Sequence, residues 1–296
     1  MAHKKINVAL LQHACRQSVH ENKSTIEKAI EKAASNNAQL IVLQELHNSL
    51  YPCQTEDLQQ FELAEPIPGP STTWLADLAT KHHLVIISSL FEARAPGLYH
   101  NTAVVFDRDG SMAGKYRKMH IPDDPGYYEK FYFTPGDLGF HPIQTSLGCI
   151  GVLVCWDQWY PEAARLMALA GADILVYPTA IGWGSNDSAD EQQRQLNAWI
   201  TIQRAHAIAN GIPVLAANRV GYEADPSGQT TGIEFWGNSF ITGPQGDILA
   251  QADHRSAKIL YAELDLKRNT QVRQIWPFFR DRRIDGYADL IKRYRD

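Results

Sequence analysis

Cys155 is the residue of this chain whose surroundings best suit nucleophilic chemistry. It follows the short apolar run Ile150 to Val154, which is rich in β-branched residues and predicts a buried strand. Pro161 and Glu162 then begin a helical stretch, because proline is favoured in a first helical turn. Free cysteines are usually small buried apolar residues. A thiol between a strand end and a helix N-terminus, however, is placed where thiolates are stabilised, so Cys155 is a candidate nucleophile.

Two ionisable residues also lie at the ends of predicted strands. Glu45 follows the strand 40–43 and could take the proton of a cysteine and later activate water. Taken alone, a glutamate in such a position is more often a solvated loop carboxylate. Lys118 ends the predicted strand 111–118 within a basic cluster, where nothing local distinguishes it from a solvated lysine.

The elements that must position these residues occur in an order that the chain repeats. Each half predicts strands and helices in alternation, followed by a hairpin. In the first half these are strands 6–11, 40–43 and 84–90, helices 21–35 and 71–83 with Ser71 as N-cap, and the hairpin 102–106 and 111–118. In the second half they are strands 150–154, 173–177 and 212–217, helices 161–170 and 191–209, and the hairpin 237–241 and 248–252.

Two similar halves predict an α/β fold with an internal pseudo-twofold. If each sheet carries its helices on one face, the two remaining apolar faces are buried against each other, giving a four-layer α-β-β-α sandwich. We expect one domain over residues 1–265, with halves of about 1–145 and 146–265. Residues 266–296 form a tail with aromatic and charged residues but no periodicity, which we expect at a subunit interface of a homo-oligomer, a dimer or larger.

Composition excludes several classes of protein. The 296 residues are 44% hydrophobic with a net charge of -5 and scattered basic residues, which does not favour nucleic-acid binding. No apolar run approaches the roughly 20 residues of a membrane span, and the first residues predict a strand instead of a signal peptide. Four cysteines form neither a disulfide framework nor a zinc spacing. We therefore expect a cytoplasmic protein with neither a nucleic-acid nor a membrane partner.

Four sequence blocks together resemble the signature blocks of the nitrilase superfamily of carbon-nitrogen hydrolases, in the same order and over nearly the whole chain. They are QELHNSLY (44–51), GKYRKMHIP (114–122), GYYEKFYFTPGD (126–137) and CWDQWYPEAARLMALAGADILVYPTAIG (155–182). Within the superfamily, the blocks are most similar to those of the branch that hydrolyses N-carbamoylputrescine. Tyr128 stands where plant members of that branch often have glutamine.

The resemblance implies a Glu-Lys-Cys triad formed by Glu45, Lys118 and Cys155, with Glu129 positioning the lysine and the substrate. It implies that the Cys155 thiolate attacks the carbamoyl carbon while Lys118 and the backbone N–H of Trp156 stabilise the oxyanion. Release of the amine and hydrolysis of the carbamoyl-thioester then need no metal and no organic cofactor.

The residues that would select a carbamoylated diamine are less clearly indicated. Related enzymes acting on N-carbamoyl-D-amino acids tend to have arginine at the position of Gln158, so a neutral residue there favours a substrate without a carboxylate. Several acidic side chains could receive the ammonium of the substrate, and several aromatic side chains could line a slot for its methylenes. The acidic candidates are Asp124, Asp157, Asp187, Asp190 and Glu191, of which Asp187 is our choice, and the aromatic ones are Tyr51, Tyr127, Trp156 and Trp183.

Two alternatives remain open from the sequence. The protein could be another amidase of the superfamily, acting on ω-amides or on carbamoyl-β-amino acids. It could also be a binding protein that has kept the sandwich and lost the chemistry, although the presence of all three triad residues argues against this.

Overall fold

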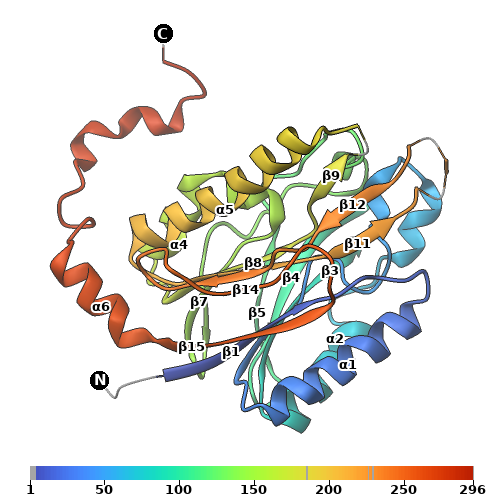
Figure 1. Ribbon diagram of the computed structural model, residues 1–296, viewed down its shortest axis with the longest axis horizontal. Coiled ribbons are helices and arrows are strands. Elements are labelled where there is room, and N and C mark those ends of the chain that lie inside the picture. Colours follow the sequence, from blue (N-terminus) through green and yellow to red (C-terminus); the bar gives the residue numbers. More distant parts are fainter. Residues whose placement is uncertain (1–4, 185, 226, 229, 296) are drawn as a thin grey trace.

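Two six-stranded sheets packed face to face form the centre of the protein, and helices cover their outer faces (Figure 1). The computed structural model describes residues 5–184, 186–225, 227–228 and 230–295. The first sheet has the order β15-β1-β2-β3-β4-β5. Its strands are β1 (Lys5–Gln12), β2 (Leu40–Val42), β3 (Val85–Ala95), β4 (Leu98–Phe106), β5 (Met112–Arg117) and β15 (Lys258–Asp265). The strands β1, β2 and β3 run parallel, and the others are antiparallel to their neighbours.

The second sheet has the order β14-β13-β10-β8-β7-β6, with β7, β8 and β10 parallel. Its strands are β6 (Ile143–Thr145), β7 (Gly148–Val152), β8 (Ile174–Thr179), β10 (Val214–Asn218), β13 (Phe240–Thr242) and β14 (Ile248–Gln251). A small third sheet joins β11 (Val220–Glu223), β12 (Ile233–Trp236) and β9 (Gly182–Gly184). The parallel strands are nearly continuous apolar runs because both of their faces are buried.

Successive side chains along each strand of the first sheet point to opposite faces, so its apolar side chains form two layers. In β1, Ile6, Val8 and Leu10 face the core between the sheets, whereas Ala9 and Leu11 face the outer helices. Those helices are α1 (Val19–Ser35) and α2 (Pro70–His82), below the sheets in Figure 1. The helices α4 (Pro161–Leu169) and α5 (Ala189–Asn210) cover the second sheet above. The predicted α/β class and α-β-β-α layering are therefore confirmed.

Helix ends follow local chemistry. The Ser188 side chain accepts a hydrogen bond from the N–H of Glu191 (3.3 Å) and caps α5, and Gly211 ends it with φ 62°. The predicted N-cap of α2, Ser71, was wrong: Gly69 is the cap and Pro70 takes the first helical position. Proline fits there because its missing N–H has no partner in a first turn.

The main element that the sequence did not predict is β15, which pairs antiparallel with β1 over eight residue pairs. It therefore places the last strand of the chain in the first sheet. Leu260, Ala262 and Leu264 face the core between the sheets, whereas the residues between them are exposed, because only one face of this edge strand is buried. The short strands of the third sheet were not predicted either.

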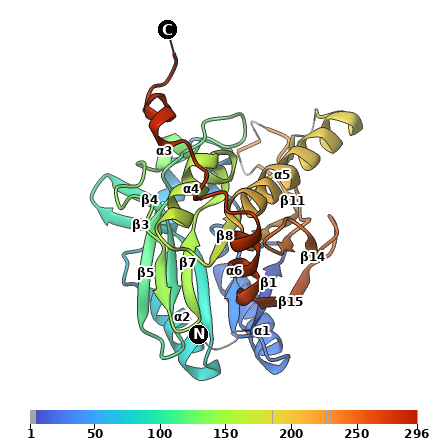
Figure 2. The same ribbon diagram turned by 90° about the vertical axis from the view of Figure 1, so that its left-hand side faces the viewer.

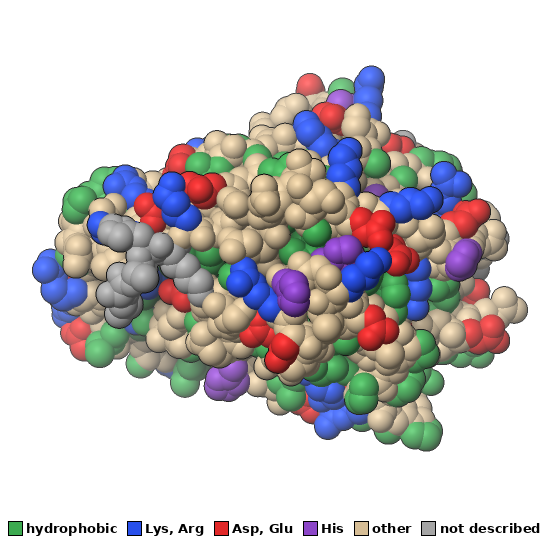
Figure 3. Space-filling view, turned by 90° about the horizontal axis from the view of Figure 1, so that it is seen from below, with side chains coloured by type: hydrophobic (Ala, Val, Ile, Leu, Met, Phe, Trp, Pro, Cys, Tyr) green, Lys and Arg blue, Asp and Glu red, His purple; other side chains and the backbone are tan. Residues whose placement is uncertain are grey.

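The C-terminal segment leaves the body of the molecule (Figures 1 and 2). It begins with α6 (Leu266–Ile275) and continues to residue 295 with only two short 3₁₀ turns, η4 (Ile284–Gly286) and η5 (Ala288–Ile291). The remaining short elements are η1 (Pro52–Gln54), η2 (Leu58–Leu63), α3 (Glu129–Tyr132) and η3 (Cys155–Trp159). Acidic and basic side chains are interspersed on the face seen from below (Figure 3). None of the helices in the described ranges is long and apolar enough to cross a membrane.

Candidate active site

The carboxyl ends of strands from both sheets bring the candidate catalytic residues together. Glu45 follows β2 and Lys118 follows β5 in the first sheet, whereas Cys155 follows β7 in the second sheet. Glu129 begins the short helix α3. All four side chains are buried.

Lys118 lies between two carboxylates. Its Nζ donates to Oε1 of Glu45 at 2.8 Å and to Oε1 and Oε2 of Glu129 at 2.9 and 2.7 Å. Burial alone would lower the pKa of Lys118, but the charges of Glu129 and Glu45 raise it well above its usual value. The lysine is therefore an ammonium at neutral pH.

Glu129 is held from its other side by Tyr51, whose hydroxyl donates to Oε1 at 2.7 Å. Burial raises the pKa of Glu129 to about 7, against the lowering effect of the Lys118 ammonium. Tyr51, expected to contact the substrate, thus lies where it supports a carboxylate beside the lysine.

The two oxygens of Glu45 have different surroundings. Oε1 accepts hydrogen bonds from Lys118 and from Nδ2 of Asn101, the latter at 2.7 Å. Oε2 is buried and has no hydrogen-bond partner among the described residues. One oxygen is therefore fixed in place while the other is available to accept a proton. Sequence reasoning missed Asn101, which has no distinguishing local pattern.

Cys155 opens the turn η3 in a left-handed backbone conformation, with φ 41°. Such a conformation is costly for a residue other than glycine and persists only where the surroundings fix it. Asp157 helps to fix it, because its Oδ2 accepts from the N–H of Val154 at 2.9 Å and from the hydroxyl of Tyr116 at 2.9 Å. Burial, and after it the charge of Glu45, raises the pKa of the Cys155 thiol, so that a base is needed to form the thiolate.

A cavity of about 630 Å³ opens onto Cys155. Its walls contain three of the predicted substrate-binding residues, Tyr127, Trp156 and Asp187. Two further acidic candidates, Asp124 and Glu191, also line it. The lining residues that the sequence did not single out include Trp159, Arg194, Gln195 and Trp236.

Other predicted residues lie outside the cavity wall. Gln158 is fully buried, with Oε1 accepting from Thr179 Oγ1 at 3.3 Å. The ring of Trp183 packs against that of Trp236 in a tilted arrangement, with ring centroids 5.6 Å apart, and its Nε1 donates to the carbonyl of Gln192 at 3.1 Å. Asp157 is buried in the turn and Asp190 is exposed in the first turn of α5. Tyr51, Gln158 and Trp183 do not border the cavity, which corrects the position that we expected for them.

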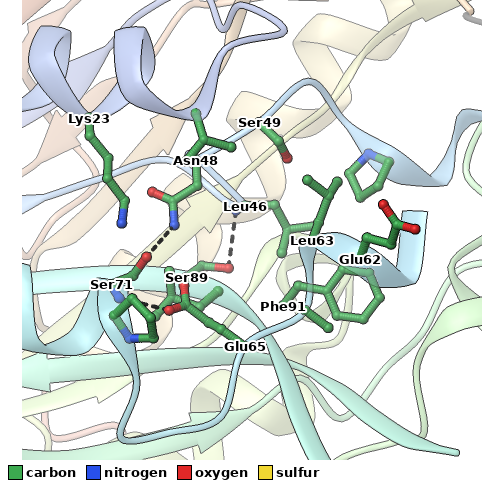
Figure 4. A pocket seen from close by; sticks show the side chains of 15 residues that line it. Lys23, Leu46, Asn48, Ser49, Glu62, Leu63, Glu65, Ser71, Ser89 and Phe91 are labelled. Carbon is green, nitrogen blue, oxygen red and sulfur yellow. Dashed lines mark hydrogen bonds between the residues drawn. The ribbon is translucent and has the colours of Figure 1, made fainter. Parts of the chain in front are cut away.

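A second, smaller cavity of about 240 Å³ lies beside the loop that follows Glu45 (Figure 4). Leu46 and Ser89 line it, and the N–H of Leu46 donates to Ser89 Oγ at 3.3 Å. Asn48 donates from Nδ2 to Ser71 Oγ at 2.8 Å on the same side. In the part of the chain that the structure describes, no cluster of three His, Cys, Asp or Glu side chains is arranged to hold a metal ion.

Comparison with known proteins identifies the family. The model of the carbon-nitrogen hydrolases matches residues 7–274. The chain belongs to this family. The resemblance to the nitrilase superfamily is thereby confirmed, and the protein is a hydrolase of carbon-nitrogen bonds.

Individual relatives of this carbon-nitrogen hydrolase match over almost their whole length. It is 42% identical to an N-carbamoylputrescine amidase of Solanum lycopersicum, over 97% of this chain and 95% of that protein. It is also 42% identical to a citrullinase of Francisella tularensis, over 98% of this chain and 99% of that protein. The crystal structure of a carbon-nitrogen hydrolase from Helicobacter pylori G27 superimposes with a TM-score of 0.96 at 56% identity, covering 98% of this chain and all of that one.

Proposed function

We propose that this hydrolase converts N-carbamoylputrescine to putrescine, CO2 and ammonia, a step of polyamine biosynthesis. The observation that carries the proposal is a cavity lined both by the buried Cys155 and by the carboxylate of Asp187, which forms no ion pair among the described residues. The relatives named N-carbamoylputrescine amidase support it.

In the proposed mechanism, Glu45 accepts the thiol proton of Cys155 through its free Oε2, and the sulfur bonds to the carbamoyl carbon. The negative charge that develops on the carbamoyl oxygen is stabilised by the Lys118 ammonium and by the backbone N–H of Trp156. The carbon-nitrogen bond to the diamine then breaks, and Glu45 returns the proton to the departing nitrogen.

The second half of the reaction frees the enzyme. The carbamoyl group remains on the sulfur as a thioester, and Glu45 takes a proton from a water molecule that attacks it. Carbamate leaves, the thiol regains its proton, and carbamate decomposes to CO2 and ammonia. Glu129 keeps Lys118 oriented through both steps.

Recognition of the distal ammonium is assigned to Asp187. One of its oxygens accepts from the N–H of Gly184 at 2.9 Å, which fixes the carboxylate, and it forms no ion pair among the described residues. Glu191, by contrast, is paired with Arg194 at 2.7 Å. Asp187 is therefore the better partner for a cation entering the cavity.

A second candidate substrate is an ω-carbamoyl amino acid such as citrulline. Arg194 lines the same cavity and could bind a carboxylate while Asp187 binds the α-ammonium. The relative named citrullinase supports this alternative. A cytoplasmic location and a homo-oligomeric state complete the proposal.

Ammonia release from four substrates tests the assignment: N-carbamoylputrescine, citrulline, N-carbamoyl-β-alanine and glutamine. We expect the highest kcat/KM with N-carbamoylputrescine. Asp187→Asn should raise KM for it by roughly ten- to a hundredfold, because a part-buried charge pair is lost, with little change in kcat. Asp190→Asn, a control at an exposed carboxylate outside the cavity, should change neither constant. Preferred turnover of carbamoyl-β-alanine or glutamine would refute the proposed substrate.

A further inference from the structure

Arg219 is a fully buried arginine between the strands β10 and β11 of the second half. A buried guanidinium is costly unless its donors are satisfied. Its side chain reaches across to the first half of the chain and bonds to the segment 45–51, which carries Glu45 at its beginning and Tyr51 at its end.

Three backbone carbonyls of that segment accept hydrogen bonds from Arg219. Nη2 donates to the carbonyl oxygens of Glu45 (3.0 Å) and Leu46 (2.9 Å), and Nη1 donates to that of Ser49 (3.0 Å). Carbonyls of an irregular loop have no ladder partners, so a single planar guanidinium can satisfy several at once. The arginine thus fixes the backbone directly behind the proposed base.

Glu223 holds the other end of the segment. Its Oε1 accepts from Arg219 Nη1 at 2.7 Å and its Oε2 accepts from the N–H of Tyr51 at 2.6 Å. The Tyr51 hydroxyl in turn donates to Glu129, which holds Lys118. One buried ion pair is therefore connected to both carboxylates that flank the lysine.

If this ion pair were removed, backbone strain would favour a movement of the segment 45–51, and a neighbouring cavity would give it space. Leu46 has φ 46°, a left-handed conformation that is unfavourable for leucine. On its other side lies the cavity of about 240 Å³, where the segment donates uncharged hydrogen bonds to the hydroxyls of Ser89 and Ser71 (Figure 4). Removal of the guanidinium would let Leu46 relax toward that space and move Glu45 with it.

We infer that Arg219, together with Glu223, is a positioning residue for the hydrolysis: from the second sheet it sets the location of Glu45 and, through Tyr51, that of Glu129. The inference rests on the proposed role of Glu45 as the base. A purely structural role would require the ion pair to stabilise the fold, and a buried ion pair by itself is weak grounds for expecting added stability.

Three variants test the inference. Arg219→Lys keeps the charge beside Glu223 but cannot reach three carbonyls and a carboxylate at once. Glu223→Asp keeps the ion pair but is one methylene too short to hold both Arg219 and the N–H of Tyr51. Arg273→Lys is the matched control, since Arg273 also donates to a backbone carbonyl, that of Asn210 (2.9 Å), at the end of α5 remote from the cavity.

Each variant is purified as the full chain, and its folded fraction is measured by circular dichroism and thermal unfolding. The kinetic readouts are kcat and KM for N-carbamoylputrescine and the rate of Cys155 alkylation by iodoacetamide, followed by mass spectrometry. Alkylation requires the thiol to be activated but needs no carbamoyl substrate, so it remains informative if the proposed substrate is wrong.

For Arg219→Lys we expect kcat to fall by roughly a hundredfold, the effect of a misplacement of about 1 Å, with KM changed less than about threefold. Alkylation of Cys155 should slow in parallel, and Glu223→Asp should show a smaller loss of the same kind. Arg273→Lys should lower only the unfolding temperature. The inference fails if folded Arg219→Lys or Glu223→Asp keeps wild-type kcat and alkylation rate, or loses activity only in proportion to its folded fraction. If Arg219→Lys does not fold, the result with Glu223→Asp decides.

Discussion

The ammonium of Lys118 forms ion pairs with two buried carboxylates, those of Glu45 and Glu129. Because these side chains are buried, the protonation of either carboxylate changes the balance of charge around the lysine. Burial raises the pKa of Glu129 to about 7, so this carboxylate gains a proton at a pH where exposed carboxylates remain ionised.

The pH dependence of the reaction should report this proton. Below about pH 7 Glu129 becomes neutral and holds Lys118 less firmly, so kcat/KM should fall as the pH decreases through that value. Glu129→Gln cannot ionise, and its residual activity should lose this acidic limb. Profiles of kcat/KM between about pH 5 and 9 for both proteins provide the measurement, and an unchanged acidic limb in the variant would assign the proton to another group.

The residues of the site differ in how far the sequence could reveal them. Glu45, Lys118 and Cys155 each follow a strand and each lie in a recognisable block, so the sequence could nominate them. Asn101 and Arg219 act through contacts with segments 56 and 174 residues away in the chain. No local pattern encodes such contacts, because the first needs the strands of one sheet to be paired and the second also needs the two halves of the chain to be packed together.

At the level of elements, the turn η3 decides which side chains meet the substrate. Trp156 and Trp159, three residues apart in a 3₁₀ turn, fall on the same face and line the cavity. Gln158 falls on the inner face, and its carbonyl accepts from Nε2 of His206 at 2.8 Å. We expected Gln158 to face the substrate from this turn, and the three-residue repeat explains why Trp156 and Trp159 reach the cavity instead.

Two substitutions to arginine should therefore change different quantities, one the stability of the fold and the other KM. Gln158→Arg would bury a cation without a counter-charge and should lower the free energy of unfolding by about 3 kcal/mol or more, whatever the substrate. Gln195→Arg would place a cation in the cavity wall and should raise KM for N-carbamoylputrescine while the fold stays stable. Thermal unfolding and KM, measured on both variants, separate the two effects, and a selective KM effect at Gln158 would contradict the position described here.

The strands also show where sequence patterns stop being informative. Those buried on two faces, such as β1 and β8, are continuous apolar runs and were predicted. The strand β15 is buried on one face only, so its apolar residues alternate with exposed ones and form no continuous apolar run of the kind that revealed the other strands.

On the scale of the whole molecule, the C-terminal segment (266–295) leaves apolar side chains uncovered. Its charges are largely paired within the segment, as in Arg283 with Asp285 and Lys292 with Asp289. Its apolar side chains remain open to solvent, and Ile291 is 95% exposed. Contiguous exposed apolar residues of this kind are typical of surfaces that a partner covers.

We expect the segment to cover a second copy of the chain. Ile291→Asp should shift the mass of the particle in solution toward the monomer, because a charge in an apolar interface is costly. Light scattering after size exclusion gives that mass. Leu58→Asp, at a 75% exposed leucine on η2, is the control and should leave the mass unchanged. A wild-type protein that is already monomeric would contradict the expectation.

The pairing of β1 with β15 has a consequence for the synthesis of the protein on the ribosome. The strand β1 leaves the ribosome before β15, the partner that closes its outer edge and ends at Asp265. At about 5–20 residues per second, synthesis of the intervening chain takes roughly 10–50 s. During that interval the nascent chain exposes an unpaired strand edge, which is a template for pairing with other chains on the same messenger. Chaperones that shield early segments should therefore affect the yield of this protein more than its final stability.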